Sequence, residues 1–454
     1  MPSRGDAPRR ISVFGLGKLG SVVAACWASR GFEVIGVDPN REFVDKINQG
    51  VAPVQEPHLD RMIAEAGERL RATTDGREAV LATDITFMVV PTPSNPDGGY
   101  AIDYVLSCCD VIGPALAEKG PGHLVTLKST VLPGACADRI IPRLEETSGR
   151  RAGEHFGFCY NPEFIALGSV VQNLLEPSFL LIGESHPEAG EMLVEAHSRM
   201  LGNDTPMPRM SCANAELAKL AVNSLLTMKI TFANLIAQLC EQLPDGDSDV
   251  VTSAVGLDPR IGNKYLKGGL GFGGPCFPRD NSAVLHLARK LGVPFPLAAA
   301  TDQANAALTV RIAEQVEESL PRDGKVAVLG LSYKPDTPVV EESQGLALAA
   351  TLAKRGYRVS VYDPMALETA RPELGDSVRY AEQLRECVAD ADVVAVATPW
   401  KEFRDLPLEA MNAAGPRIVH DCWGIVDGSS HPGVKIRVLG VGESSVGESS
   451  GVYR

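Results

Sequence analysis

A short apolar run that breaks into regularly spaced glycines constrains the fold of this chain more than any other feature. ISVFGLGKLG at 11–20 begins with β-branched residues and then places glycines at Gly15, Gly17 and Gly20. SVVAACWASRG follows with helical spacing, and FEVIGVD at 32–38 has the composition of a second strand. This order predicts a βαβ unit, in which a helix joins two parallel strands and covers the sheet.

The same alternation of strand and helix patterns recurs towards both ends of the chain. Further strands are expected in 84–93, 123–134, 156–164 and 179–183, and again in 325–338, 357–364, 392–400 and 417–423. Residues 211–243 contain neither Gly nor Pro, which predicts one long helix or two abutting ones, apolar on more than one face. The chain therefore predicts an α/β fold of two Rossmann-like, doubly wound domains joined by a central helical domain with a long helix.

The composition narrows the classes of protein and partner. With 454 residues, 44% hydrophobic and 22% charged, the chain suits a soluble globular protein of several domains. A net charge of −14 argues against a nucleic-acid partner, and the lack of any run of about 18 uncharged apolar residues argues against a membrane span. Ten scattered cysteines without a C-x-x-C pair predict neither a metal site nor disulfides, and they favour a cytoplasmic location.

The first glycine turn is a candidate dinucleotide site. Gly15, Gly17 and Gly20 fit G-x-G-x-x-G between a strand and a helix, and Asp38 ends the next strand about 20 residues further on. Such glycines let backbone N–H groups approach a pyrophosphate at the helix N-terminus, while the carboxylate binds ribose hydroxyls. Asp38 would repel a 2′-phosphate, which favours NAD over NADP. The alternative is a tight βα turn without a ligand.

A second glycine-rich loop surrounds a single cysteine. GFGGPCFPRD at 271–280 places Cys276 between a glycine run and a Phe-Pro pair, four residues before Asp280. The thiol is either a buried filler or a nucleophile displayed to a substrate. The second Rossmann-like turn, GLSYKPDTP, lacks the later glycines, so Lys334 is either a phosphate or sugar contact or a surface lysine.

Several motifs, in this order and spacing, resemble those of the nucleotide-sugar 6-dehydrogenases, the UDP-glucose/GDP-mannose dehydrogenase family. They span about residues 11 to 427 and read GLGKLG, VVPTP, KSTVLPG, NPEF, ELAKLAVNS, RIGNKYLKGGLGFGGPCFPRD and GLSYKPDT. The resemblance implies an enzyme that oxidises a CH₂OH group of a nucleotide sugar to a carboxylate, using two NAD⁺ and a covalent thioester. Conversion of UDP-glucose to UDP-glucuronate is the first expectation. A UDP-N-acetylhexosamine or another nucleotide-diphosphate sugar is the alternative substrate.

The resemblance also implies catalytic roles. Cys276 would be the nucleophile, and Asp280 with a bound water would be the base for the substrate hydroxyl. Thr130 in KSTV would hold that water, and Glu163 in NPEF would be the base for thioester hydrolysis.

Lys219 and Asn223 are expected to share one face of the long helix, because they lie four residues apart. An ammonium and an amide there would stabilise the oxyanion of a tetrahedral intermediate, although a merely polar helix face is the alternative. Cofactor contacts are expected from Gly15, Gly17, Leu19, Gly20, Asp38, Pro91, Thr92, Thr130 and Arg279. Substrate contacts are expected from Glu163, Phe164, Lys219, Asn223, Arg260, Tyr265, Lys267, Gly273 and Lys334.

The resemblance assigns a function to each expected domain. An NAD-binding Rossmann domain is expected over 1–205, a central helical dimerisation domain with the cysteine loop over 206–322, and a nucleotide-sugar-binding Rossmann-like domain over 323–440. In the family, the arginine that matches Arg260 reaches in from a neighbouring subunit, so a homodimer or a higher homo-oligomer is expected. The tail, 441–454, repeats VGESS and is too polar to pack, so we expect it to be disordered.

Three positions depart from the family pattern. Leu167 stands where UDP-glucose dehydrogenases usually carry a second glutamate, Glu341 where many relatives carry an arginine, and Trp423 where some carry a nucleotide-binding arginine. These departures leave open which sugar and which nucleotide base the substrate carries. Two other classes also remain: a two-electron hydroxy-acid dehydrogenase, which would not need the cysteine loop, and a dinucleotide-sensing protein that has lost catalysis.

Overall fold

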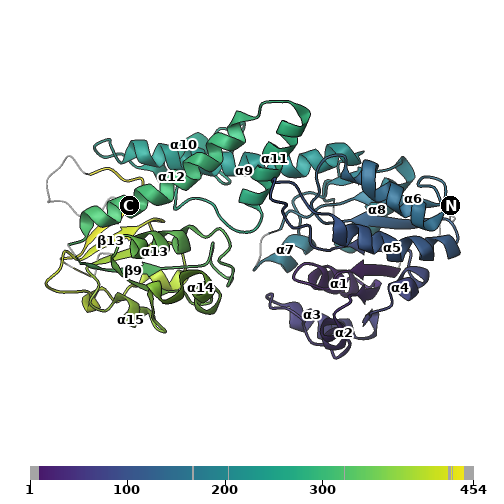
Figure 1. The fold of residues 1–454 in the computed structure, drawn as a ribbon, viewed down its shortest axis with the longest axis horizontal. Helices are drawn as coiled ribbons and strands as arrows, with labels where there is room; N and C mark the ends of the chain where they lie inside the picture. The colour runs from purple at the N-terminus through teal and green to yellow at the C-terminus, as the bar shows by residue number, and fades with distance from the viewer. Residues whose placement is uncertain are drawn as a thin grey trace. The chain divides into compact units, whose positions relative to one another are not determined.

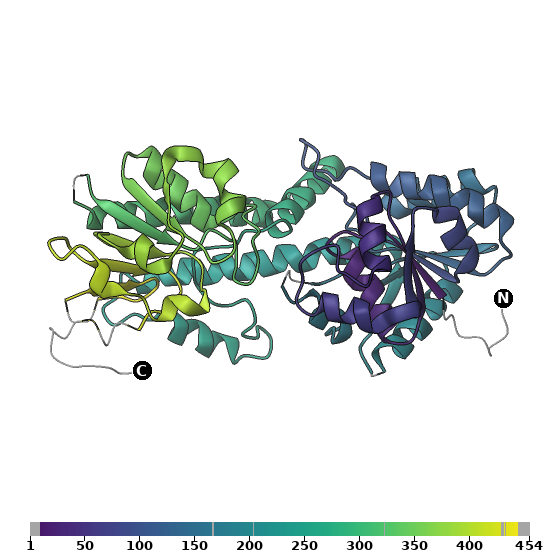
Figure 2. The same cartoon turned by 90° about the horizontal axis from the view of Figure 1, so that it is seen from below.

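The computed structural model describes residues 10–165, 168–202, 204–321, 323–427, 431 and 433–443 (Figure 1). The chain divides into two compact units, Met1–Ala221 and Val222–Arg454. A single 29-residue helix, α9 (Cys212–Cys240), begins in the first unit and ends in the second (Figure 2). The stretch without Gly or Pro therefore forms one helix and not two.

An eight-stranded sheet forms the centre of the first unit. Its strands are β1 (Arg10–Phe14), β2 (Glu33–Val37), β3 (Leu70–Thr73), β4 (Ile85–Met88), β5 (His123–Leu127), β6 (Phe156–Tyr160), β7 (Ile182–Glu184) and β8 (Arg209–Ser211). They pair in the order β3-β2-β1-β4-β5-β6-β7-β8, in parallel except between β6 and β7. Every residue of β5 is buried, as expected for a parallel strand covered on both faces.

Helices cover this sheet and bury two apolar clusters against it. They are α1 (Gly20–Ser29), α2 (Arg41–Asn48), α3 (Leu59–Ala66), α4 (Gly76–Ala82), α5 (Asp103–Glu118), α6 (Ile141–Ser148), α7 (Val170–Leu175) and α8 (Pro187–Leu201). One cluster is centred on Trp27 of α1, whose ring stacks on Phe87 of β4 at 5.4 Å. The other joins Ile112 of α5 and Leu144 of α6 to Phe158 of β6.

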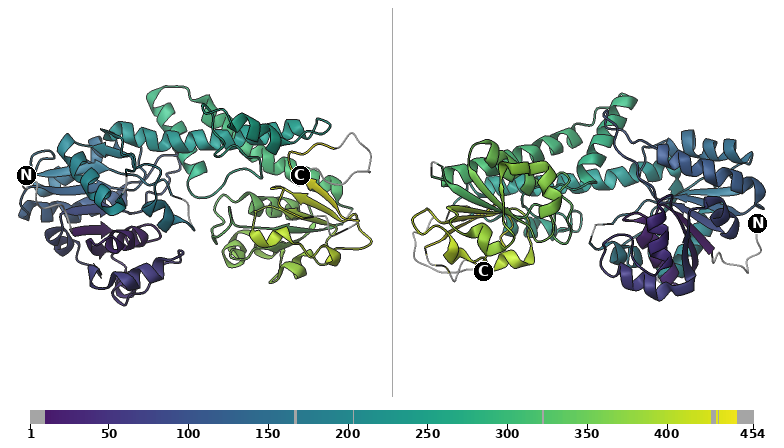
Figure 3. Two further views of the ribbon diagram at one scale, coloured as in Figure 1. Left: turned by 180° about the vertical axis from the view of Figure 1, so that it is seen from behind. Right: turned by 60° about the horizontal axis from the view of Figure 1, so that its bottom comes forward.

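The second unit contains a six-stranded sheet in which all neighbouring strands are parallel (Figure 3). The strands are β9 (Lys325–Leu329), β10 (Arg358–Tyr362), β11 (Arg379–Tyr380), β12 (Val393–Val396), β13 (Ile418–Asp421) and β14 (Lys435–Val438), in the order β11-β10-β9-β12-β13-β14. The remaining helices are α10 (Ser248–Gly256), α11 (Phe277–Leu291), α12 (Pro296–Ser319), α13 (Gln344–Lys354), α14 (Leu367–Leu374) and α15 (Leu384–Val388).

The long helix α9 is long and apolar enough to cross a membrane by length and composition alone, a property that it shares with core helices of soluble proteins. Its Glu216 is fully buried and accepts hydrogen bonds from the backbone N–H groups of Gly134 and Cys136 at 2.7 and 2.8 Å. Because both oxygens of this buried carboxylate accept hydrogen bonds from the protein backbone, we expect α9 to pack in a protein core.

The structure confirms the expected fold class, with two Rossmann-like sheets and a central helical region that includes the long helix. One strand is placed differently from the expectation of a parallel sheet. The segment expected at 179–183 forms β7 and runs antiparallel to β6. The chain leaves the sheet at the end of β6 and re-enters it as β7 at the same end, so no crossover connection is needed. An antiparallel strand near the edge is common in such sheets.

The expected domain boundaries remain a prediction, and part of the expected tail makes contacts. Gly442 donates its N–H to the Gly246 carbonyl at 2.8 Å, and Val441 forms an isolated bridge with Asp247. Residues 444–454, which hold most of the VGESS repeat, lie outside the described residues, as does Leu167.

Candidate active site

The first glycine turn has the shape of a dinucleotide cradle. Gly15 has φ +94°, and a Cβ there would lie 2.3 Å from the Val89 carbonyl oxygen. A Cβ at Gly20, the first residue of α1, would lie 1.8 Å from the Gly15 carbonyl oxygen. A Cβ at Gly17 would meet nothing within 4 Å. Gly15 and Gly20 are therefore required by packing, while Gly17 leaves backbone open to a pyrophosphate at the start of the helix.

Asp38 lies directly after β2 and is fixed beside this turn. Its Oδ2 accepts the Leu16 N–H at 2.7 Å, and its Oδ1 accepts the Asn40 N–H at 2.8 Å. The residue is 9% exposed. A carboxylate oriented in this way can also accept hydrogen bonds from ribose hydroxyls. Leu19 is the N-cap residue of α1 and belongs to the same turn.

The segments after β4 and β5 are tied together at the carboxyl edge of the sheet. Thr92 donates its hydroxyl to the Thr130 carbonyl oxygen at 2.8 Å, and Ser129 donates to the Val90 carbonyl oxygen at 2.6 Å. Pro91 lies between these anchored positions. Ligands of open α/β sheets bind at this edge, so the predicted cofactor residues of the first unit lie where a cofactor is expected.

The NPEF segment after β6 lies against the beginning of α9. Lys219 of α9 donates from Nζ to the Glu163 carbonyl oxygen at 2.7 Å. The same ammonium lies 4.5 Å from the centre of the Phe164 ring. Glu163 is 9% exposed, and its Oε1 accepts a hydrogen bond from Lys128. The structure thus brings together three of the predicted substrate residues and adds Lys128.

In the second unit, Cys276 is exposed and is the N-cap residue of α11. A helix N-terminus favours negative charge, so this position suits a thiolate. Asp280, in the first turn of α11, is 1% exposed and accepts a hydrogen bond from Asn223 Nδ2 at 2.6 Å. The Nε atom of Arg279 lies 3.7 Å from Asp280 Oδ1. The nucleophile, the base and one oxyanion donor predicted from the sequence therefore lie on α11 and the adjoining part of α9.

The glycines before Cys276 are needed for packing. A Cβ at Gly273 would lie 2.2 Å from the Glu342 carbonyl oxygen. A Cβ at Gly274, which has φ +82°, would lie 2.5 Å from the Tyr333 ring. Burial, with a smaller contribution from the nearby Cys276, raises the pKa of Tyr333. The loop is thus pressed against the 333–343 segment, and Lys334 extends its ammonium to 5.9 Å from the Tyr333 ring centre.

The predicted substrate residues of the 258–267 loop lie on the surface and have partners of their own. The Arg260 side chain is 86% exposed and pairs with Asp258 at 2.6 Å. Lys267 pairs with Asp249 at 3.1 Å. Tyr265 has φ +62°, is 49% exposed, and lies 6.4 Å, between ring centres, from Phe277, the residue after Cys276.

One departure from the family pattern, Trp423, has a structural role. A Cβ at Gly269 would lie 2.5 Å from the Trp423 ring, and the indole Nε1 donates to the Ala397 carbonyl oxygen at 2.9 Å. Trp423 therefore supports the glycine-rich loop. The backbone carbonyl oxygen of Glu341 accepts the Gly274 N–H at 3.0 Å, a contact that does not depend on the glutamate side chain.

Sequence reasoning missed three buried polar residues around Glu163, namely Lys128, Asn161 and His197. Lys128 and Asn161 stand in the quoted motifs KSTVLPG and NPEF. The available signal was their position: each directly follows an apolar strand, where a polar side chain lies at the ligand-binding edge. His197 lies inside α8, and its spacing in the sequence gave no such signal.

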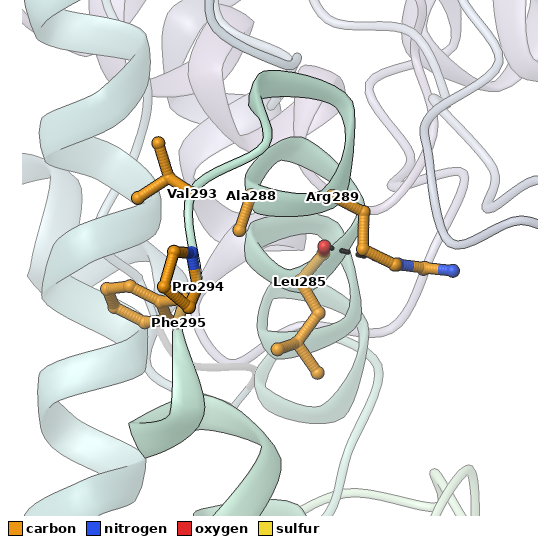
Figure 4. Close-up of a pocket in the computed structure, with 6 residues that line it drawn as sticks. All are labelled: Leu285, Ala288, Arg289, Val293, Pro294 and Phe295. Atoms are coloured by element: carbon orange, nitrogen blue, oxygen red, sulfur yellow. Dashed lines mark hydrogen bonds between the residues drawn. The ribbon is translucent and has the colours of Figure 1, made fainter.

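A pocket at the turn between α11 and α12 has no relation to these residues (Figure 4). Leu285, Ala288, Arg289, Val293, Pro294 and Phe295 line it. The Arg289 Nε donates to the Leu285 carbonyl oxygen at 3.3 Å, and the other lining side chains are apolar. No predicted site residue lines this pocket, and we do not assign it to the reaction.

Comparison with known proteins agrees with this arrangement. The chain matches the NAD binding domain (residues 9–201), central domain (213–307) and UDP binding domain (327–428) of the UDP-glucose/GDP-mannose dehydrogenase family. It is 38% identical to a UDP-glucose 6-dehydrogenase of Haloferax volcanii, over 90% of this chain and 96% of the relative. It is 35% identical to a GDP-mannose 6-dehydrogenase of Azotobacter vinelandii, over 90% and 95%.

A solved UDP-glucose dehydrogenase from Pyrobaculum islandicum aligns with a TM-score of 0.86 at 34% identity, over 98% of this chain and 99% of that chain. Sequence and fold thus agree along nearly the whole chain, and they agree with the glycine cradle in the first unit. The chain belongs to the UDP-glucose/GDP-mannose dehydrogenase family and is an NAD-dependent nucleotide-sugar 6-dehydrogenase.

Proposed function

We propose that the substrate is UDP-glucose and the product UDP-glucuronate. Two of the similar proteins above are UDP-glucose dehydrogenases, and the C-terminal match is to a UDP binding domain. The observation that carries the chemistry is the exposed Cys276 at the N-terminus of α11, beside the Asn223–Asp280 hydrogen bond. GDP-mannose is the second candidate, because a GDP-mannose 6-dehydrogenase is nearly as similar. UDP-N-acetylhexosamines complete the set of substrates to be tested.

The proposed reaction removes four electrons from C6. Two molecules of NAD⁺, bound one after the other, would supply the hydride acceptor for the two oxidations. Asp280, through a water, takes the hydroxyl proton in the first, and Thr130 is assigned to hold a water for proton transfer. The Cys276 sulfur then bonds to the aldehyde carbon, giving a thiohemiacetal whose oxidation yields a thioester. Water attacks the thioester carbonyl, Glu163 accepts the water proton, and the C–S bond breaks to release the carboxylate and the thiolate.

Lys219 and Asn223 are proposed to stabilise the negative oxygen of each tetrahedral intermediate. Both side chains are buried on α9, with exposures of 7% and 6%. Their donors are fixed by the hydrogen bonds to the Glu163 carbonyl and to Asp280. A donor of this kind typically contributes about 2.7–4 kcal/mol to lowering the barrier. For the substrate itself, we propose contacts from Phe164, Arg260, Tyr265, Lys267, Gly273 and Lys334.

The proposed partner of the chain is a second copy of itself. Apolar side chains recur at helical spacing on one face of α9 and are 45% to 62% exposed. They are Leu217, Leu225, Phe232, Leu235 and Leu239. A stripe at this spacing is typical of a helix that packs on a partner helix. The ten cysteines, all within the described ranges, form no disulfide, which supports a reducing compartment such as the cytoplasm.

The substrate proposal can be tested with a panel of nucleotide sugars. Purified protein is incubated with NAD⁺ and UDP-glucose, GDP-mannose or a UDP-N-acetylhexosamine, and NADH per sugar is measured together with the sugar product. We expect two NADH per UDP-glucose and UDP-glucuronate as the product. One NADH per sugar with release of an aldehyde would contradict the thioester route, and a higher kcat/KM for another sugar would replace UDP-glucose.

A further inference from the structure

A buried lysine faces the Glu163 carboxylate from the neighbouring strand. Lys128 directly follows β5, and Glu163 lies three residues beyond β6, the strand paired with β5. The Lys128 ammonium bonds Glu163 Oε1 and also donates to Asn161 Oδ1 at 2.9 Å. Its third side faces the Phe87 ring, with 5.1 Å between Nζ and the ring centre. The two side chains are 1% and 7% exposed, so the ion pair is almost fully removed from water.

Asn161 holds Lys128 in one orientation. Its Oδ1 accepts hydrogen bonds from Lys128 and from His197 Nε2, each at 2.9 Å. Its Nδ2 donates to the Leu181 carbonyl oxygen at 2.9 Å. Because donors converge on one end of the amide and an acceptor meets the other, the amide cannot be flipped without breaking all three bonds.

His197 completes the chain as a neutral donor. Burial, and then the positive charge of Lys128, lower its pKa well below the ordinary value. A neutral ring that donates from Nε2 has an acceptor at Nδ1, and this atom has no hydrogen-bond partner among the described residues. The ring packs against both Trp27 and Phe87, at 5.0 and 6.4 Å between centres, so packing fixes its plane.

Stability alone does not account for this arrangement. A buried ion pair carries a desolvation cost, and replacing such a pair with well-packed apolar side chains is often neutral or stabilising. The pair lies at the carboxyl edge of a parallel sheet, where ligands bind, and only one carboxylate oxygen takes part in it. The geometry therefore favours a role at Glu163 over a role in the core.

We propose that Lys128, oriented by Asn161 and His197, is a positioning residue that holds Glu163 for the hydrolysis of the thioester. This inference rests on the proposed function, in which Glu163 takes a proton from the attacking water. Lys128 anchors Oε1, so that Oε2 is presented in one direction to that water. Lys128 itself exchanges no proton and forms no bond with the substrate.

The test measures hydrolysis separately from oxidation. Lys128→Met removes the ammonium and keeps the chain length, and Glu163→Gln removes the base. Each is mixed rapidly with saturating UDP-glucose and NAD⁺, and NADH is followed through the first turnover. Because only the last step is impaired, Lys128→Met should give a burst of two NADH per active cysteine followed by turnover slower by at least about tenfold. Intact-mass measurement should then show the uronosyl group attached to Cys276.

Two comparisons isolate the role of Lys128. In the Glu163→Gln background, Lys128→Met should slow hydrolysis little further, since it acts through Glu163. Lys119→Met is the matched control: this ammonium also bonds carbonyl oxygens, including Val80 at 2.7 Å, but it lies before β5, at the opposite edge of the sheet. Lys119→Met should turn over at the wild-type rate without an adduct.

The outcomes distinguish the two proposals. If Glu163→Gln accumulates the adduct and Lys128→Met does not, the inference about Lys128 fails while the role of Glu163 stands. If Glu163→Gln accumulates none, Glu163 is not the base and the proposed function fails at that step. Should Lys128→Met not fold, Asn161→Leu is measured in its place. This variant keeps the ion pair of Lys128 with Glu163 but removes the amide that holds Lys128 in one orientation. It should accumulate a smaller amount of adduct, and turnover at the wild-type rate without adduct would overturn the inference.

Discussion

At the scale of single residues, replacing Cys276 is the most direct test of the proposed thioester. The cysteine is exposed and caps α11, so Cys276→Ser should fold normally but lose the soft nucleophile. We expect acid formation to fall by more than about 1,000-fold, as is typical when a covalent nucleophile is removed. The measurement is the amount of uronate formed per enzyme. Cys108→Ser, at a half-buried cysteine of α5, is the control and should retain activity.

Two other results would show which steps need the sulfur. If Cys276→Ser formed acid at the wild-type rate, the thioester would not be an intermediate. If it released aldehyde after one NADH per sugar, the first oxidation would be shown to proceed without the sulfur.

The glycine motif predicted the turn at Gly15 and Gly17, beside which the structure fixes Asp38, while the cofactor contacts of these residues stay a prediction. The position of Lys128 directly after a strand offered a signal, but its pairing with Glu163, 35 residues away, and the contact of His197 with Asn161, 36 residues away, could not be predicted. Spacing along one strand or helix cannot report such a contact. It also could not show that Gly273 and Gly274 are required by packing against the 333–343 segment.

At the scale of secondary structure elements, α9 makes the clearest prediction. Phe232→Glu places a charge in the middle of the exposed apolar stripe, where it would be desolvated in a dimer but hydrated in a monomer. We expect the protein to shift from dimer towards monomer. Light scattering after size-exclusion chromatography, over a range of protein concentrations, measures this change.

Tyr104→Glu is the matched control, since it adds the same charge in place of an aromatic side chain that is 56% exposed on a different helix, α5. It should leave the mass unchanged. A wild-type protein that is monomeric at all concentrations, or a Phe232→Glu variant as dimeric as the wild type, would contradict a dimer built on this face.

Element types followed from simple patterns. The stretch without Gly or Pro predicted α9, and β-branched runs ending in glycine predicted β1 and β9. The direction of β7 could not be predicted, because a three-residue strand carries no signal for its partner's direction. The short strands β3, β8, β11 and β14 were also missed; such segments owe their structure to the sheet beside them.

At the scale of the whole molecule, buried histidines in both units link stability to pH. Burial lowers the pKa of His123 in the first unit to about 3 and that of His420 in the second to about 4. The value in the unfolded chain is about 6.5. Between the folded and unfolded values, only the unfolded chain binds the proton. Each group's contribution is therefore fully present above the unfolded value and is lost as the pH falls below it.

We expect the free energy of unfolding to decrease on acidification from pH 7.5 to pH 5 by about 2 kcal/mol for each such histidine. The midpoint of thermal unfolding, measured at fixed protein concentration, should fall accordingly. Carboxylates also contribute to acid unfolding, so the informative quantity is the difference between variants. His420→Gln, which cannot titrate, should lose less stability over this pH range than the wild type. His58→Asn, at an exposed histidine, should follow the wild type. If the three proteins lost stability in parallel, the buried histidines would not be the source, because a neutral imidazole held away from water must resist protonation until the fold opens.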